Sequence, residues 1–181
     1  MTASEEALSD VSGAELTEAR RLLVDLVSTP SPSGEETEAA ERLVDFFEAH
    51  GREARIDEVG NVHAPADDAV LLTSHIDTVP GDIPVEIRDE GEGEELWGRG
   101  SVDATGPLSA MAVAAVETGV SFLGVVGEEV DSRGSRHVIE SDRPEPGAVV
   151  NGEPSGWTGI TLGYRGLLAG TYVATSESGH T

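Results

Sequence analysis

The chain has 181 residues, of which 35 are acidic and 11 basic, and its formal net charge at pH 7 is -24. All the basic residues are arginine, and a surface of this charge repels itself unless salt screens it, which favours a protein from a cell with molar internal salt over an ordinary acidic protein. Nucleic acid and anionic membranes are poor partners for this charge, and the lack of cysteine excludes disulfides and thiolate metal sites.

The N-terminal residues are polar and acidic, without the apolar stretch of a signal peptide, and no segment approaches membrane-spanning length. We therefore expect a cytoplasmic protein. Residues 16–27 carry apolar side chains at helical spacing. After a loop at 29–34, Ser33 and Glu36 have the spacing of a capping box for a helix that runs to His50, with Gly51 as its stop.

The middle of the chain alternates between predicted strands and predicted helices. Strands are expected around 54–56, 61–63, 70–74, 120–126 and 148–151. Helices are expected at 107–117 and near 135–139, and the acidic stretch 89–95 predicts a solvated turn. This alternation predicts a three-layer α/β/α domain with a mostly parallel sheet.

The pattern of apolar and polar residues changes after Trp157. Residues 167–176 alternate between apolar and polar positions, as strands of antiparallel sheets do. We expect the first domain to cover residues 1–160 and a second domain to begin at 161–181.

Three apolar runs, at residues 70–74, 120–127 and 148–152, each end on side chains that bind metals. These side chains are an imidazole and carboxylates: His75, Asp77, Glu128, Glu129 and Glu153. If the runs are neighbouring parallel strands, the side chains meet at the carboxyl edge of the sheet, where open α/β sheets bind ligands. The sequence therefore predicts a metal centre at this edge.

Imidazole and oxygen donors without sulfur suit zinc, cobalt or manganese. A further acid, Asp103, precedes a predicted helix and is either a helix cap or a bridge between two ions roughly 3.5–4 Å apart. Adjacent carboxylates such as Glu128 and Glu129 can divide their roles, one binding metal and the other taking a proton from bound water. Asp77 can fix the ring of His75.

Four motifs occur in order and at sensible spacing: Ser74-His75-Ile76-Asp77-Thr78-Val79-Pro80, Gly98-Arg99-Gly100-Ser101-Val102-Asp103, Gly127-Glu128-Glu129 and Asn151-Gly152-Glu153-Pro154. Together they resemble the co-catalytic zinc amidohydrolases, a family that includes acetylornithine deacetylase, succinyl-diaminopimelate desuccinylase, carboxypeptidase G and aminoacylase. The resemblance implies a zinc-peptidase-like catalytic domain followed by the start of an inserted α+β dimerisation domain. It also implies a homodimer with two zinc or cobalt ions per subunit.

The resemblance also implies roles for the ligands. His75 and Glu153 hold one ion, Glu129 holds the other, and Asp103 bridges them. Members of the family are longer than this chain, and the remainder supplies a final histidine of the second ion site. We therefore expect the 181-residue chain alone to be unstable or inactive.

The same resemblance assigns catalytic roles. Glu128 is the general base and acid, and Asp77 supports His75. His180, in Ser178-Gly179-His180, matches a histidine that reaches the partner subunit's active site and stabilises the oxyanion; its other reading is a loop residue. Arg165 is either a ligand for a substrate carboxylate or the partner of an acid. The other histidines, His50, His63 and His137, match no motif.

Within the family, the segments Asp103-Ala104-Thr105-Gly106-Pro107-Leu108 and Gly163-Tyr164-Arg165-Gly166 are most similar to hydrolases that release lysine or ornithine from an amino-group carrier protein in lysine and arginine biosynthesis. Thr105 stands where that subfamily commonly has lysine. The implied reaction is hydrolysis of the amide bond of an N-acylated amino acid. The alternatives are a deacetylase, desuccinylase or peptidase of the same family, or a non-catalytic metal-binding module.

Overall fold

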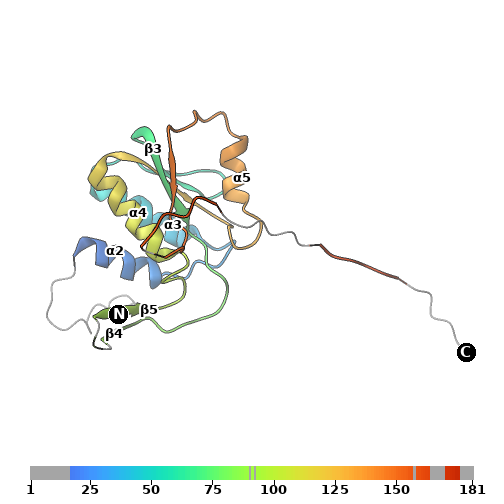
Figure 1. Cartoon of the computed structure of the whole chain (residues 1–181), viewed down its shortest axis with the longest axis horizontal. Coiled ribbons are helices and arrows are strands. Elements are labelled where there is room, and N and C mark those ends of the chain that lie inside the picture. The colour runs from blue at the N-terminus through green and yellow to red at the C-terminus, as the bar shows by residue number, and fades with distance from the viewer. Residues whose placement is uncertain (1–16, 90, 92, 157, 164–169, 176–181) are drawn as a thin grey trace, which may run out of the picture.

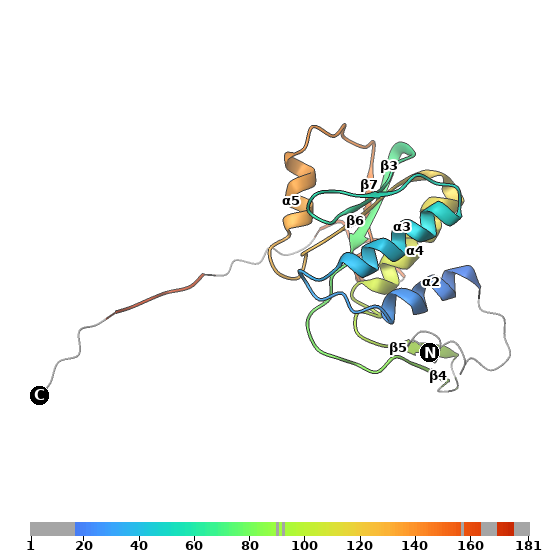
Figure 2. The same ribbon diagram turned by 180° about the vertical axis from the view of Figure 1, so that it is seen from behind.

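The computed structural model describes residues 17–89, 91, 93–156, 158–163 and 170–175. Its main sheet has five strands in the order β1-β2-β6-β3-β7 (Figures 1 and 2). These strands are β1 (Arg55–Ile56), β2 (Val62–Ala64), β3 (Asp67–His75), β6 (Val120–Val125) and β7 (Val149–Asn151). Strands β6, β3 and β7 are parallel neighbours, whereas β1 and β2 continue the sheet in antiparallel fashion. The predicted α/β fold is confirmed, and the parallel strands form one side of the sheet.

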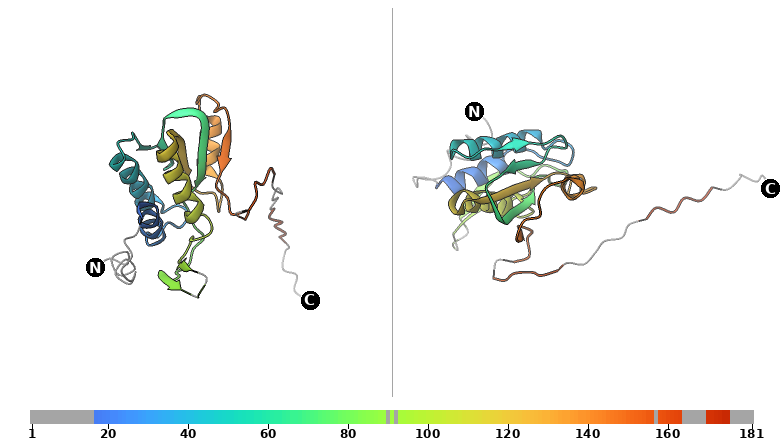
Figure 3. Two further views of the ribbon diagram at one scale, coloured as in Figure 1. Left: turned by 60° about the vertical axis from the view of Figure 1, so that its left-hand side comes forward. Right: turned by 90° about the horizontal axis from the view of Figure 1, so that it is seen from above.

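Helices cover both faces of this sheet (Figure 3). Helices α2 (Glu18–Val27), α3 (Thr37–Ala49) and α4 (Thr105–Thr118) share a core with one face, and α5 (Arg133–Glu140) packs on the other. Because side chains alternate along a strand, Leu72 of β3 enters the first core and Leu71 enters the second.

The helix ends follow the local sequence in two cases. Helix α2 begins after Thr17, whose side chain accepts a hydrogen bond from the amide of Arg20. Helix α3 stops before Gly51, whose φ of 68° suits a residue without Cβ. None of the described helices combines the length and apolar character needed to cross a membrane.

Two sequence predictions differ from the structure. The acidic stretch 89–95 predicts a turn, but its two ends belong to strands: β4 (Glu86–Asp89) and β5 (Glu94–Trp97) form a small antiparallel sheet on either side of residues 90–93. Arg88 lies over the ring of Trp97 at 4.0 Å from its centroid, a cross-strand contact that composition does not reveal. The strand predicted at 167–176 is also wrong for residues 170–175, which are exposed and form no strand. They lie beside none of the described strands with which they could share backbone hydrogen bonds.

Candidate metal centre

The three parallel strands, β6, β3 and β7, end at one edge of the sheet. His75, the last residue of β3, lies beside Val125, the last residue of β6, and Thr73 lies beside Asn151 of β7. Since these strands are parallel, the segments that follow them, which carry Glu129 and Glu153, start from the same edge. The predicted convergence of the strand ends is confirmed.

Three carboxylates gather around the imidazole of His75. Ligand atoms of His75, Asp103 and Glu129 all lie within 4.8 Å of one another. The distance from Nε2 of His75 is 3.0 Å to Oδ1 of Asp103 and 3.7 Å to Oε1 of Glu153. His75 is buried, Glu129 and Glu153 are half-buried, and Asp103 is exposed. The imidazole is thus the buried member of the group, and the carboxylates are its more exposed members.

The electrostatics of this group favour a bound cation. Burial alone would lower the pKa of His75, but the carboxylates of Asp77, Glu153 and Asp103 together raise it to about 9. Burial and the neighbouring negative charges raise the pKa values of Glu129 and Glu153. Carboxylates held this close repel one another, and a divalent cation would relieve that repulsion. The donor set, one imidazole with three carboxylates, fits zinc, cobalt or manganese.

Asp77 has a larger structural role than the sequence predicts. It is fully buried, and its Oδ1 and Oδ2 accept hydrogen bonds from the backbone amides of Glu128 (3.0 Å) and Glu129 (3.1 Å). Oδ2 also accepts the hydroxyl of Ser33 at 2.6 Å. Burial opposes ionisation, but these donors and His75 hold the pKa of Asp77 well below its ordinary value. One carboxylate therefore joins the ends of β3 and β6.

The predicted contact between Asp77 and His75 is present in altered form. Nδ1 of His75 donates to the backbone carbonyl of Asp77 at 2.8 Å, whereas Oδ1 of Asp77 is 3.5 Å away. With Nδ1 protonated, Nε2 of His75 is free to bind a metal. The backbone of Asp77 thus fixes the ring, and its side chain adds a negative charge beside it.

The Glu128–Glu129 pair is held so that its two carboxylates differ in surroundings. Glu128 is exposed, whereas Glu129 is half-buried beside His75 and Asp103. This division agrees with one ligand and one proton acceptor. The two further residues predicted to act in catalysis or substrate binding, His180 and Arg165, lie outside the described residues.

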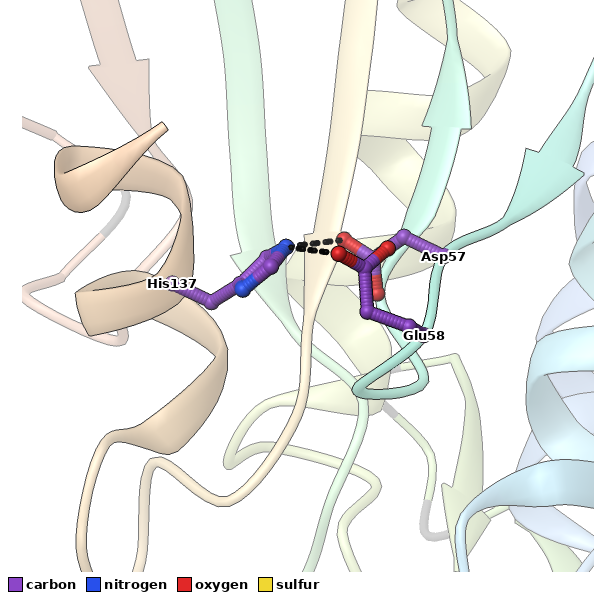
Figure 4. A group of neighbouring side chains, drawn as sticks. All are labelled: Asp57, Glu58 and His137. Atoms are coloured by element: carbon purple, nitrogen blue, oxygen red, sulfur yellow. Dashed lines mark ion pairs between the residues drawn. The ribbon is translucent and has the colours of Figure 1, made fainter. Parts of the chain in front are cut away.

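A second group of His and carboxylate side chains lies between α5 and the β1–β2 loop (Figure 4). Nε2 of His137 is 3.3 Å from Oε1 of Glu58 and 3.9 Å from Oδ2 of Asp57, and Nε2 of His63 is 2.8 Å from the same Oδ2. Oδ1 of Asp57 accepts three backbone amides of its own loop, from residues 59, 60 and 61. Asp57 is thus already saturated with donors, and we assign this group to the folding of the loop.

Asp57→Ala is therefore expected to lower the free energy of unfolding by about 1–3 kcal/mol, because buried amide donors lose their acceptor. Although burial raises it, hydrogen bonds from His63 and Asn61 hold the pKa of Asp57 below its ordinary value. A lowered folded-state pKa adds stability that is present above about pH 4 and lost as the pH falls below it. Urea unfolding at pH 7 and pH 3 should show a smaller difference between variant and wild type at pH 3; an equal difference would contradict this role.

Comparisons with known proteins agree with the family resemblance of the motifs. The sequence profile of peptidase family M20/M25/M40 matches residues 71–174. A Pyrococcus abyssi protein that carries the provisional name LysW-lysine/LysW-ornithine hydrolase is 47% identical over 165 residues, which are 88% of this chain and 47% of that protein. The LysW-lysine hydrolase of Deinococcus radiodurans is 41% identical, over 90% of this chain and 47% of that protein. The chain spans about half the length of the curated relatives it matches.

Solved structures agree on the fold. The aminoacylhistidine dipeptidase from Vibrio alginolyticus superposes with a TM-score of 0.60 and 22% identity, over 81% of this chain and 35% of that one. The aminopeptidase PepT from Bacillus cereus gives a TM-score of 0.52 at 22% identity, over 69% of this chain and 40% of that one.

Proposed function

Because the chain belongs to peptidase family M20/M25/M40, we propose that it carries most of a two-metal hydrolytic centre that cleaves the amide bond of an N-acylated amino acid. The convergence of one imidazole and three carboxylates at the sheet edge is the observation that carries this proposal. In it, His75 and Glu153 would hold one zinc or cobalt ion, Glu129 would hold the other, and Asp103 would be the ligand common to both.

The metal would supply Lewis acidity and a bound water of lowered pKa. Glu128, exposed beside the ligands, takes the proton of the attacking water and returns it to the leaving amine. Asp77 keeps the backbone of Glu128 in place through its amide. Nδ1 of His75 carries the ring proton and donates a hydrogen bond to the backbone carbonyl of Asp77. Nε2 is therefore unprotonated and would be the metal-binding nitrogen.

We assign residues 1–160 to the catalytic domain and 161–181 to the start of a dimerisation domain. In a homodimer, His180 would donate a hydrogen bond to the oxyanion that forms on the substrate carbonyl in the partner subunit. Arg165 would bind a substrate carboxylate through its planar guanidinium. Both assignments rest on motif positions in the sequence.

The proposed substrate is lysine or ornithine joined through its amine to a carrier protein. The names of relatives that are 41% and 47% identical support this choice. An acidic carrier and this chain repel each other at low salt, and molar salt would screen that repulsion.

The substrate proposal predicts a preference that can be measured. With the protein expressed at the full length of its coding sequence, kcat/KM in molar potassium chloride should be higher for carrier-linked lysine or ornithine than for acetylornithine or succinyl-diaminopimelate. The same assay with added zinc or cobalt, and with chelator as the control, tests the metal requirement. Equal or reversed preference would favour the deacetylase, desuccinylase or peptidase alternatives. Absence of turnover on all substrates with metal bound would favour a non-catalytic metal-binding module.

A further inference from the structure

The turn before α3, segment 31–36, reaches two loops of the metal centre. The capping box predicted for Ser33 and Glu36 is wrong: α3 begins at Thr37, and its N-cap, Glu36, makes no capping hydrogen bond with its side chain. The hydroxyl of Ser33 instead donates to Asp77, and the carboxylate of Glu36 accepts hydrogen bonds from Arg133 at 2.7 and 2.8 Å. These two side chains are thus directed away from their own helix and toward the site.

Segment 31–36 is fixed to the end of β3 by its backbone as well. The amide of Thr78 donates to the carbonyl of Ser31 at 2.9 Å, and the hydroxyl of Ser31 donates to the carbonyl of Ile76 at 3.0 Å. Pro32 forms a parallel bridge with Thr78. The position of Ser33 relative to Asp77 is therefore set by the contacts of Ser31 and Pro32 with the residues on either side of Asp77.

Ser33 completes the set of donors around the buried carboxylate of Asp77. Oδ2 of Asp77 is shared between the hydroxyl of Ser33 and the amide of Glu129. Without the hydroxyl, the carboxylate would lose the short bond of 2.6 Å that fixes its plane. Its hydrogen bonds with the amides of Glu128 and Glu129 would then weaken.

Glu36 holds the other end of the loop that carries Glu128 and Glu129. Arg133 begins α5, and its guanidinium lies against Gly127, so closely that a Cβ at Gly127 would collide with it. Gly127 also has a φ of 70° and accepts backbone hydrogen bonds from residues 131 and 132. Glu36 is only 4% exposed, whereas the Arg133 side chain is half-buried, so the ion pair is only partly screened by water and salt.

We propose that Ser33 and Glu36 are positioning residues of the metal centre, which hold the Glu128–Glu129 loop at its distance from His75 through Asp77 and Arg133 respectively. This inference rests on the proposed function, because it concerns the same metal centre. It goes beyond that proposal by assigning a site role to residues that touch neither the ligands' side chains nor the substrate.

The test is a titration of the full-length, metal-free protein with Co²⁺, followed by calorimetry and by the visible absorption of the bound ion. Ser33→Ala is expected to weaken Co²⁺ affinity about 10- to 100-fold and to alter the absorption bands, as loss of outer hydrogen bonds does at metal sites. Ser33→Thr, which keeps the hydroxyl, should restore both. Glu36→Gln should weaken affinity in the same direction.

Ser121→Ala is the matched control. Ser121 is buried and, like Ser33, donates a hydrogen bond of 2.6 Å to a carboxylate, that of Asp68, but at the opposite end of β3 and β6. It should lower the thermal midpoint as Ser33→Ala does, without changing Co²⁺ affinity or absorption. If wild type binds Co²⁺ and both Ser33→Ala and Glu36→Gln bind it equally well, the positioning role is overturned and the metal centre stands. If wild type binds no Co²⁺, the proposed function and this inference both fail.

Discussion

Glu128→Gln is expected to lower kcat by about 10²- to 10⁴-fold, the usual contribution of a positioned general base and acid. The amide side chain keeps the size of the carboxylate but cannot take a proton from water. Glu128 is exposed at the sheet edge, and its backbone amide stays bonded to Asp77, so the geometry of the loop should not change. The measurements are kcat on the preferred substrate and Co²⁺ affinity of the same preparation.

Metal affinity separates a proton acceptor from a ligand in this variant. Affinity should change little, because Glu128 is not a ligand in this assignment and its charge adds only to the general negative potential around Glu129 and Glu153. Glu117→Gln is the control, since Glu117 is an exposed carboxylate in the last turn of α4, at the far end of that helix from Asp103. If Glu128→Gln binds metal much more weakly than wild type, Glu128 is a ligand and the assigned division of roles is wrong.

Three of the four proposed ligands were predictable from the sequence because each follows an apolar run. An apolar strand of β-branched and aliphatic residues ends where polarity returns, and parallel neighbours end at one edge. His75, Glu129 and Glu153 obey that rule, and the register of β3 with β6 and β7 confirms that their strands end at one edge. Asp103 follows no strand, and only its place in a motif indicated that it joins the site.

The supports of the site were not predictable in this way. Ser33 bonds to Asp77 across 44 residues, and Glu36 bonds to Arg133 across 97. No local pattern encodes such contacts, and the spacing of Ser33 and Glu36 matched a capping box equally well. The two carboxylate oxygens of Asp77 likewise accept hydrogen bonds from the backbone amides of Glu128 and Glu129. These contacts form only when β3 and β6 lie side by side.

Asp77→Asn is expected to damage both folding and metal binding. The asparagine side chain keeps one acceptor oxygen, but its NH₂ group replaces the other oxygen and faces a hydrogen-bond donor. At least one of the three groups that now donate to Asp77 is therefore left without an acceptor. Each such group costs about 1–3 kcal/mol of unfolding free energy. Loss of the charge beside His75, together with a looser Glu128–Glu129 loop, should weaken Co²⁺ binding about 10- to 100-fold. Denaturant unfolding of the metal-free protein and Co²⁺ titration measure the two effects separately.

Asp68→Asn gives the comparison that isolates the site effect of Asp77→Asn. Asp68 lies near the start of β3, accepts the hydroxyl of Ser121 at 2.6 Å and pairs with Arg143 at 3.1 Å, so it loses the same kind of interactions far from the metal ligands. Its substitution should reduce stability less, because Asp68 is exposed where Asp77 is not, and it should leave Co²⁺ affinity unchanged. Equal Co²⁺ affinity in the two variants would mean that Asp77 serves the fold alone. In that case the carbonyl of residue 77, which no substitution removes, would be sufficient to orient His75.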